Sequence, residues 1–363
     1  MGKIILFGGT FDPIHHGHFL MAEYAYQVIK ADQVIFIPAK TPRWKNPVAS
    51  KEDRYAMLKR YLKPHDWAKI SLYELETKGE EVNYSIDTID HFQKTFPDDA
   101  FFWLLGADQV AAFPRWKDAE KIATKVQLLV YSRPDIPLDE KIIADYRMRI
   151  LNGPSSKASS SAVRKGQALD TELDVLNYIE KQQLYYVKHL QKFLDKKRLA
   201  HSFTVARLAY LIAQANDLDK ERAYLAGLLH DLGKNMPLRE QKAIMQAHYP
   251  AYQGLKPENY HQFIGEYLAK EEFLITDEEV LLAIRTHNTG AANLRPLQMI
   301  VYAADKIEPT RGFDSSDLIE VCLEDYYRGF IATLAANREF LALKQVDTNN
   351  PLTQACFQQY LKE

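Results

Sequence analysis

The fold of the N-terminal half is decided by the segment Gly8-Gly9-Thr10-Phe11-Asp12-Pro13-Ile14-His15-His16-Gly17-His18. The apolar run Ile4–Phe7 before it predicts a buried strand, and Phe19–Lys30 after it has a helical pattern. Glycines let the backbone approach a ligand, and a helix N-terminus offers free N–H donors and the positive end of its dipole. Strand, glycine turn and helix therefore predict a phosphate-binding loop, to which the histidines add donors.

Strands and helices alternate beyond this segment. A capping box of Ser50 and Asp53 predicts the start of a helix before Arg54–Leu62, and a second helix is expected over Ile86–Phe96. Four more apolar runs predict strands, at Val34–Pro38, Ile70–Tyr73, Phe101–Leu105 and Val126–Tyr131. Strands alternating with helices predict an α/β fold with a doubly wound parallel sheet.

The second half changes character from about Val187, where β-branched runs end and helical patterns dominate. Helices are predicted over Phe203–Gln214, Lys220–Leu229, Arg239–Gln246, Phe263–Phe273, Glu278–Arg285 and Leu297–Ile307. We therefore expect two domains, an α/β domain over residues 1–186 and an all-α domain over residues 187–363. The boundary falls around Gln183–His189, and no Gly/Ser linker marks it.

The composition is typical of a soluble globular protein. The chain has 363 residues, 47% hydrophobic and 26% charged, with a formal net charge of -2, so no bulk charge favours nucleic acid or an anionic membrane as partner. Cys322 and Cys356 lack C-x-x-C spacing and are expected to be reduced. No apolar run approaches the length of a membrane span, so the cytosol is the expected location. The oligomeric state has no signal in the sequence.

The N-terminal half resembles the nicotinate-nucleotide adenylyltransferases of the nucleotidylyltransferase superfamily. The resemblance rests on His15-His16-Gly17-His18, which fits that superfamily's [Thr/His]-x-Gly-His signature, and on three later segments: Tyr84–Thr88, Gly106–Asp108, and Ser159-Ser160-Ser161-Ala162-Val163-Arg164. It implies that His15 and His18 are catalytic. It implies ATP contacts at Gly8, Gly9, Thr10, Phe11, Lys45, Gly106, Asp108, Ser160, Ser161 and Arg164, and nicotinate contacts at Ser85, Thr88 and Trp116.

One segment departs from the family pattern Pro-x-x-x-Pro-Pro-His-Lys. Here Pro38–Lys45 carries Trp44 in place of the histidine, although Arg43 and Lys45 supply positive charge. The implied reaction is attack of nicotinate mononucleotide on the α-phosphate of ATP, with Mg²⁺ bound to ATP and pyrophosphate leaving. Nicotinamide mononucleotide stays open as the alternative substrate, because the contacts around Ser85 and Trp116 decide it.

The C-terminal half carries a second set of polar residues on its predicted helices or at their ends. The set is His201, His230, Asp231, His261, His287 and Asp305. His230-Asp231 follows the apolar run Leu225–Leu229, and a buried carboxylate beside a buried imidazole is costly unless a partner such as a metal compensates it. Histidine and aspartate without cysteine suit Fe, Mn, Co or Mg better than a structural zinc site.

This set resembles the signature of the HD phosphohydrolase superfamily, and the two additional histidines fit its binuclear variant. Gly227–Lys234, His287–Gly290 and Ala304–Arg311 are similar to segments of the bacterial HD hydrolases that split diadenosine tetraphosphate into two ADP. The resemblance implies one or two transition metal ions held by the six residues, iron favoured and Mn or Co possible. It implies catalytic roles for Asp231 and Lys234, and phosphate contacts at Arg285, Lys306 and Arg311.

Two alternatives stay open for the HD domain. In the first alternative, the domain hydrolyses another nucleotide, such as a nucleoside triphosphate, a nucleotide monophosphate or a cyclic dinucleotide. In the second, it only binds a nucleotide and regulates the adenylyltransferase. A complete set of ligands favours catalysis, since a sensor need not keep every ligand.

Overall fold

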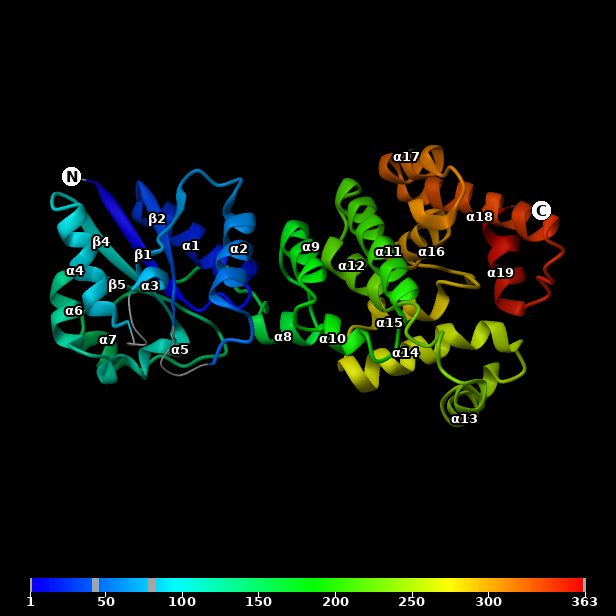
Figure 1. The fold of residues 1–363 in the computed structure, drawn as a ribbon, viewed down its shortest axis with the longest axis horizontal. Coiled ribbons are helices and arrows are strands. Elements are labelled where there is room, and N and C mark those ends of the chain that lie inside the picture. Colours follow the sequence, from blue (N-terminus) through cyan, green and yellow to red (C-terminus); the bar gives the residue numbers. More distant parts are fainter. Residues whose placement is uncertain (1, 41–45, 78–82, 362–363) are drawn as a thin grey trace. The chain divides into compact units, whose positions relative to one another are not determined.

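The computed structural model describes residues 2–40, 46–77 and 83–361. The chain forms two compact units, one of Met1–Ser161 and Asp170–Ile179 and the other of Ala162–Leu169 and Glu180–Glu363 (Figure 1). Two short segments are therefore exchanged where the chain passes from the first unit to the second. The last passage from the first unit to the second follows Ile179, a few residues before the boundary that we expected after residue 186. The exact domain boundary stays a prediction. Among the described residues, no helix is long and apolar enough to cross a membrane.

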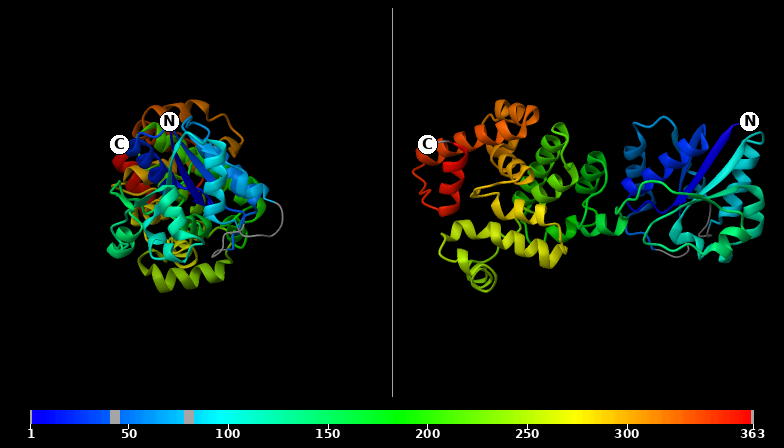
Figure 2. Two further views of the ribbon diagram at one scale, coloured as in Figure 1. Left: turned by 90° about the vertical axis from the view of Figure 1, so that its left-hand side faces the viewer. Right: turned by 180° about the vertical axis from the view of Figure 1, so that it is seen from behind.

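The first unit contains a parallel six-stranded sheet in the order β3-β2-β1-β4-β5-β6 (Figures 1 and 2). The strands are β1 (Lys3–Gly9), β2 (Gln33–Pro38), β3 (Ala68–Ile70), β4 (Ala100–Gly106), β5 (Gln127–Tyr131) and β6 (Arg149–Leu151). β1 pairs with β2 on one side and β4 on the other, so the strand order reverses there. In open α/β sheets, ligands bind outside the carboxyl ends of the strands at this reversal.

The sheet is buried on both faces because its strands are apolar at successive positions. Ile4 and Leu6 of β1 join Trp103 of β4 and Leu128 of β5 in one core cluster, together with residues of α4 and α6. Side chains alternate along a strand, so Phe7 points to the opposite face, where its ring lies 5.4 Å from that of Phe36. Burial on both faces confirms the expected doubly wound α/β fold.

The helices of this unit follow the strands in the expected alternation. They are α1 (His16–Ile29), α2 (Lys51–Leu62), α3 (Tyr73–Glu76), α4 (Ser85–Thr95), α5 (Ala107–Val110), η1 (Phe113–Arg115), α6 (Ala119–Lys125) and α7 (Glu140–Asp145); α8 (Ser160–Lys165) and α9 (Leu173–Lys181) lie where the chain passes between the units. The Ser50 cap is confirmed, since its hydroxyl accepts a hydrogen bond from the Asp53 N–H at 3.0 Å. The strand predicted over Ile70–Tyr73 is wrong beyond Ile70: pairing with β2 ends there, and Tyr73 begins α3.

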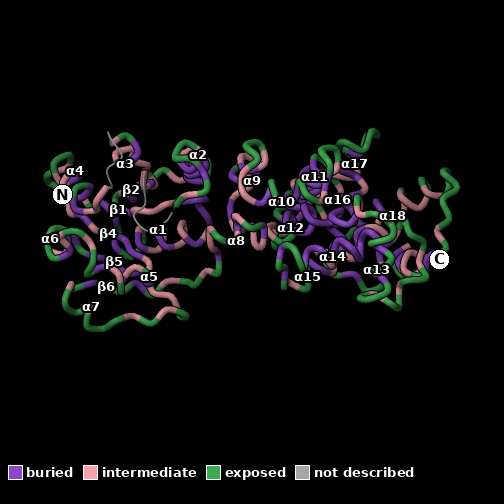
Figure 3. Tube along the Cα trace, turned by 60° about the horizontal axis from the view of Figure 1, so that its bottom comes forward, coloured by how far each residue is buried: buried purple, intermediate pink, exposed green. Residues whose placement is uncertain are grey.

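The second unit is helical throughout its described residues, as predicted. Its elements are α10 (Val187–Leu190), α11 (Lys196–Ala215), α12 (Lys220–Leu229), α13 (Leu238–His248), η2 (Pro250–Tyr252), η3 (Pro257–Asn259), α14 (Tyr260–Phe273), α15 (Glu278–Thr286), α16 (Pro296–Ile307), η4 (Pro309–Arg311), α17 (Ser316–Glu324), α18 (Tyr326–Leu343) and α19 (Pro351–Tyr360). Figure 3 shows α11, α14 and α16 largely buried.

The centre of this unit is the crossing of α11 and α12. Every residue of α12 from Ala223 to Leu229 is buried, which a helix apolar all round requires. A Cβ added at Gly227 would lie 2.9 Å from Cα of Ala206, so the two backbones meet at this point without an intervening side chain. The close crossing sets the distance between His201 on α11 and His230 at the end of α12.

We predict that Gly227→Val destabilises the second unit by about 1–3 kcal/mol or more, as overpacking of a core does. The four tryptophans all lie at or before residue 116. Loss of helical circular dichroism should therefore shift to lower temperature, while the tryptophan fluorescence transition of the first unit stays in place. Gly254→Val is the matched control, because a Cβ at Gly254 meets nothing within 4 Å. Equal melting of the two variants would contradict the assigned crossing.

Candidate active sites

The first candidate site lies at the carboxyl end of β1, where β1 ends at Gly9 and α1 begins at His16. The loop between them is tied down through its carbonyl oxygens. Arg54 donates to Thr10 at 2.7 Å, Ser160 to Pro13 at 2.9 Å, and Thr171 to Ile14 at 3.0 Å. The Arg54 guanidinium also donates to the carbonyl of Lys40, just after β2, at 3.3 Å. These side-chain donors therefore fix the predicted phosphate loop, and Arg54 joins it to the end of β2.

Two histidines of the signature lie side by side at the start of α1. The rings of His15 and His18 have centroids 3.7 Å apart at an angle of 31°. His15 is buried, and burial, followed by the charges of His18 and Arg133, holds its pKa well below the ordinary value. His15 is therefore neutral at physiological pH and presents an N–H donor rather than a cation.

The predicted nicotinate residues lie in different surroundings. The Thr88 side chain is fully buried, and its hydroxyl donates to buried Glu74 at 2.8 Å. Thr88 therefore holds α4 in place instead of presenting its own hydroxyl to a ligand. Ser85 begins α4, and partly buried Trp116 packs edge-on against Trp103 at 6.4 Å.

The predicted ATP contacts are also distributed unevenly. Gly8, Gly9 and Thr10 end β1 and begin the loop, and Gly106 and Asp108 lie where β4 passes into α5. The Phe11 side chain is buried against Phe7 and Phe36, which leaves its backbone as the group that could face ATP. Ser161 belongs to the first unit and Arg164 to the second. Lys45 lies outside the described residues.

The sequence analysis missed Arg54, Thr171 and Glu74. Arg54 lies in the first turn of an amphipathic helix, where a cation is usually solvent-exposed. A single arginine in such a pattern carries no signal of burial, because the carbonyls that bind it come from loops far away in the sequence.

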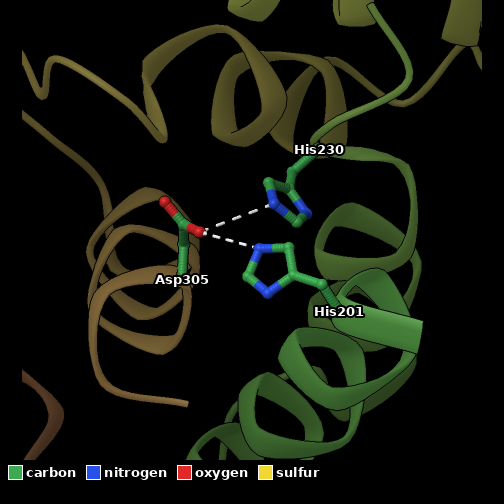
Figure 4. A group of neighbouring side chains, drawn as sticks. All are labelled: His201, His230 and Asp305. Carbon is green, nitrogen blue, oxygen red and sulfur yellow. Dashed lines mark hydrogen bonds and ion pairs between the residues drawn. The ribbon is translucent and has the colours of Figure 1, made fainter. Parts of the chain in front are cut away.

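The second candidate site is formed by six side chains from α11, α14, α16 and the ends of α12 and α15. The structure brings together all six predicted ligands: His201, His230, Asp231, His261, His287 and Asp305. Oδ1 of Asp305 lies 3.2 Å from Nε2 of His201 and 3.6 Å from Nε2 of His230 (Figure 4). Oδ1 of Asp231 lies 3.7 Å from Nε2 of both His261 and His287. Two groups, His201–His230–Asp305 and His230–Asp231–His287, each have the spacing of a metal site.

The histidine rings are oriented by their other nitrogen. Nδ1 of His230, His261 and His287 lies 2.7, 2.8 and 2.7 Å from the carbonyl oxygen three residues earlier. A carbonyl only accepts, so each Nδ1 carries a hydrogen and each Nε2 points toward the centre. In neutral His261 and His287, Nε2 keeps its unshared pair. Nε2 of His261 and His287 lie 3.2 Å apart, and burial lowers the pKa of His287 to about 4 and that of His261 well below its ordinary value.

This arrangement fits a divalent metal. Two acceptor nitrogens that face each other at 3.2 Å repel unless a cation lies between them. Nε2 of buried His230 makes no hydrogen bond among the described residues. Imidazole and carboxylate ligands together suit iron, manganese, cobalt or zinc.

Positive charge surrounds the two aspartates. Burial would raise the pKa of Asp305, but Lys306, His201, His230 and Arg311 hold it well below its usual range. Nη1 of Arg198 lies 3.1 Å from Oδ2 of Asp231. The sequence analysis missed Arg198, although it stands three residues before His201 in α11 and so shares its helix face.

Five of the six residues, all but His230, line a cavity of about 770 Å³. Five cations line it: Lys197, Arg198, Lys234, Lys306 and Arg311. Such a cavity is large enough for part of a nucleotide and is charged to hold its phosphates. Arg285, predicted to contact phosphate, does not line this cavity. It faces buried Glu266, with 3.6 Å between Nη1 and Oε1, because α15 turns it to the side away from His287.

The two units define the class of protein: a nucleotidylyltransferase-like domain joined to an HD domain. The cytidylyltransferase-like family matches residues 6–166, and the HD domain family matches residues 198–310. A solved HD superfamily hydrolase from Clostridium acetobutylicum, described as involved in NAD metabolism, is 29% identical and covers 47% of this chain and 95% of its own, with a TM-score of 0.41.

Two relatives match nearly the whole chain. The Mycoplasma genitalium protein named "Probable nicotinate-nucleotide adenylyltransferase/Ap4A hydrolase" is 32% identical over 346 residues, which are 92% of this chain and 97% of its own. A protein of the same name from Mycoplasma pneumoniae is 30% identical, over 91% of this chain and 97% of its own. The chain belongs to the nicotinate-nucleotide adenylyltransferase/Ap4A hydrolase family.

The buried Glu74–Thr88 pair generates a pH prediction for the first unit. Burial raises the pKa of Glu74 to about 7 from an ordinary value of 4.5. Between these values the folded unit keeps a proton that the unfolded chain releases, so its stability falls as pH rises through this window. Glu74→Gln removes this dependence and should make the first unit about 2–3 kcal/mol more stable than the wild type at pH 8, but not at pH 4.5.

Urea unfolding followed by tryptophan fluorescence measures this difference. Glu76→Gln is the matched control, since Glu76 is exposed on the same helix. The free energy of unfolding is compared between wild type and Glu74→Gln at both pH values. If the difference between the two proteins is the same at pH 4.5 and pH 8, Glu74 titrates normally.

Proposed function

We propose that the chain is a two-activity enzyme. Its first unit forms the deamido dinucleotide precursor of NAD and pyrophosphate from ATP and nicotinate mononucleotide. Its HD domain hydrolyses diadenosine tetraphosphate to two ADP. The observation that carries the proposal is the convergence of six histidine and aspartate side chains beside a cation-lined cavity. Five of them form two groups with the spacing of a metal site, in a chain that aligns with its relatives across both domains.

The first reaction needs positioning and charge stabilisation rather than a protein nucleophile. A phosphate oxygen of the mononucleotide bonds to the α-phosphorus of ATP, and the bond from that phosphorus to the oxygen of pyrophosphate breaks. Mg²⁺ enters as part of the ATP substrate. The loop held by Arg54 supplies a fixed backbone, and neutral His15 with His18 donates N–H groups to the phosphate oxygens.

The remaining contacts in the first unit determine which pyridine mononucleotide is bound and hold the departing phosphates. Trp116 stacks on the ring, and N–H groups at the start of α4, near Ser85, bind the carboxylate of nicotinate. Buried Thr88 and Glu74 hold that helix end in place. Ser160, Ser161, Arg164 and Lys45 are the proposed ligands of the departing phosphates.

The HD domain would hold one or two transition metals through its six-residue set, with iron proposed and manganese or cobalt as alternatives. When bound, such a metal supplies a water of lowered pKa as nucleophile. Symmetrical hydrolysis would add a water oxygen to one inner phosphorus and break the bridge to the other inner phosphate, which gives two ADP. Lys234, Lys306 and Arg311, with Arg198, bind the phosphates and offset the charge that develops on them.

We predict that His18→Ala lowers kcat for adenylyl transfer by about 10²-fold or more, as loss of one stabilising donor in a transition state does. The measurement is pyrophosphate release from ATP and nicotinate mononucleotide with Mg²⁺, with nicotinamide mononucleotide as the comparison substrate. Turnover unchanged in the variant would reject the role of His18. Equal kcat/KM for the two mononucleotides would reject the carboxylate site.

We predict that Asp231→Ala loses both bound metal and hydrolysis of diadenosine tetraphosphate, since Asp231 faces three of the four histidines. Metal content and chromatography of the products measure the two effects. Adenylyl transfer in the same protein should stay within a few-fold of wild type, and it serves as the folding control. AMP and ATP as products of the wild type would contradict symmetrical cleavage. No turnover of this substrate by metal-loaded wild type would reject the assigned activity.

A further inference from the structure

Three of the four histidines in the HD site are held in the same way, and the fourth is different. His230, His261 and His287 each direct Nδ1 at the backbone carbonyl three residues earlier. Nδ1 of His201 instead lies 3.0 Å from Oε1 of Glu308. A bond to a carboxylate is charge-assisted and is roughly twice as strong as one to a neutral carbonyl.

Glu308 is held firmly at this position. It follows α16, precedes η4, and is 1% exposed. Its Oε2 accepts from the backbone N–H of Thr310 at 2.7 Å, and its Oε1 accepts from the Thr310 hydroxyl at 2.7 Å as well as from His201. The short turn of η4 thus fixes a carboxylate beside the ring, three residues beyond Asp305.

The bond has a consequence for the other ring nitrogen. Because Nδ1 of His201 donates to Glu308, Nε2 is the nitrogen left to bind a metal, and it faces Oδ1 of Asp305 at 3.2 Å. The neighbouring carboxylate fixes the orientation of the ring, and such partners typically change metal affinity 10–100-fold when they are removed.

We propose that Glu308 is a positioning residue that makes His201–His230–Asp305 the tighter of two metal positions in the HD domain. The second position, His230–Asp231–His287 with His261, has only carbonyl-oriented rings. The inference rests on the proposed metal-dependent function. It adds that one of the two metal positions binds its ion more tightly than the other. Glu308 acts on the metal position through His201, although it also lines the cavity.

The test is a metal titration of the full-length, metal-stripped protein with Mn²⁺, followed by competition with a chelator. The wild type should bind Mn²⁺ in two classes. Glu308→Gln should weaken the tighter class by about 10–100-fold and leave the other within a few-fold. Glu320→Gln makes the same charge change at an exposed position of α17 and should bind like the wild type.

The outcomes separate this inference from the proposed function. Wild type that binds no Mn²⁺ overturns both. Wild type with two classes and Glu308→Gln with the same two affinities overturns only the inference. If Glu308 merely caps η4, the variant lowers the melting temperature of the metal-free protein without a selective loss of one class, which also overturns it. Glu308→Asp keeps the charge and should recover part of the affinity.

A measurement on the wild type covers the case in which Glu308→Gln does not fold. In the metal-free protein with ¹⁵N-labelled histidine, the ring Nδ1–H of His201 should appear as a downfield, slowly exchanging proton, assigned by its absence in His201→Gln. This signal supports the His201–Glu308 bond, and rapid exchange of that proton with water would overturn it.

Discussion

The cost of burying charge is the constraint on which both sites depend. An ionised group taken out of water destabilises a fold by several kcal/mol unless bonds of comparable strength replace its hydration. In the HD unit the groups concerned are Asp231 and Asp305, each about 5% exposed or less. In the first unit they are Arg54, at 1% exposed, and Asp12, at 4%, whose carboxylate accepts from the N–H groups of Val48 and Ala49. Each unit arranges its backbone around these groups, and so rigid geometry and function come from the same bonds.

The two units meet this constraint by different means. A parallel sheet leaves its ligand contacts to loops, so the first unit stiffens a loop by bonding its carbonyls to Arg54, Ser160 and Thr171. The HD unit needs no such ties, because its ligands stand on packed helices or at their ends. There the helix itself supplies the carbonyl that orients His230 and His287, and η3, just before α14, supplies the one that orients His261. Only His201, in the interior of α11, needs a partner from elsewhere in the sequence.

Much of this could be predicted from the sequence, and the failures have physical causes. Apolar runs identified β1, β2, β4 and β5 because those strands are buried on both faces; β6 escaped because it has three residues, two of them exposed. The helices α17 to α19 were not predicted because each buries only a narrow stripe. The six residues proposed as HD ligands could be predicted because they resemble the signature of the HD superfamily. The charge of a residue does not tell which way its side chain points. Arg285 was therefore predicted to contact phosphate, although it faces Glu266. Partners such as Glu308 or Arg54 depend on contacts that only the tertiary structure creates.

The exchange of segments between the units has a consequence for how the chain is assembled. Because Ala162–Leu169 belongs to the second unit and Asp170–Ile179 to the first, the backbone passes between the two compact bodies three times. Tyr186 is fully buried in the second unit, and Glu180 pairs there with Arg207. No single cut of the chain releases two complete bodies, and a fragment starting at residue 187 lacks side chains that its own core contains. The junction between the units is therefore part of what must fold.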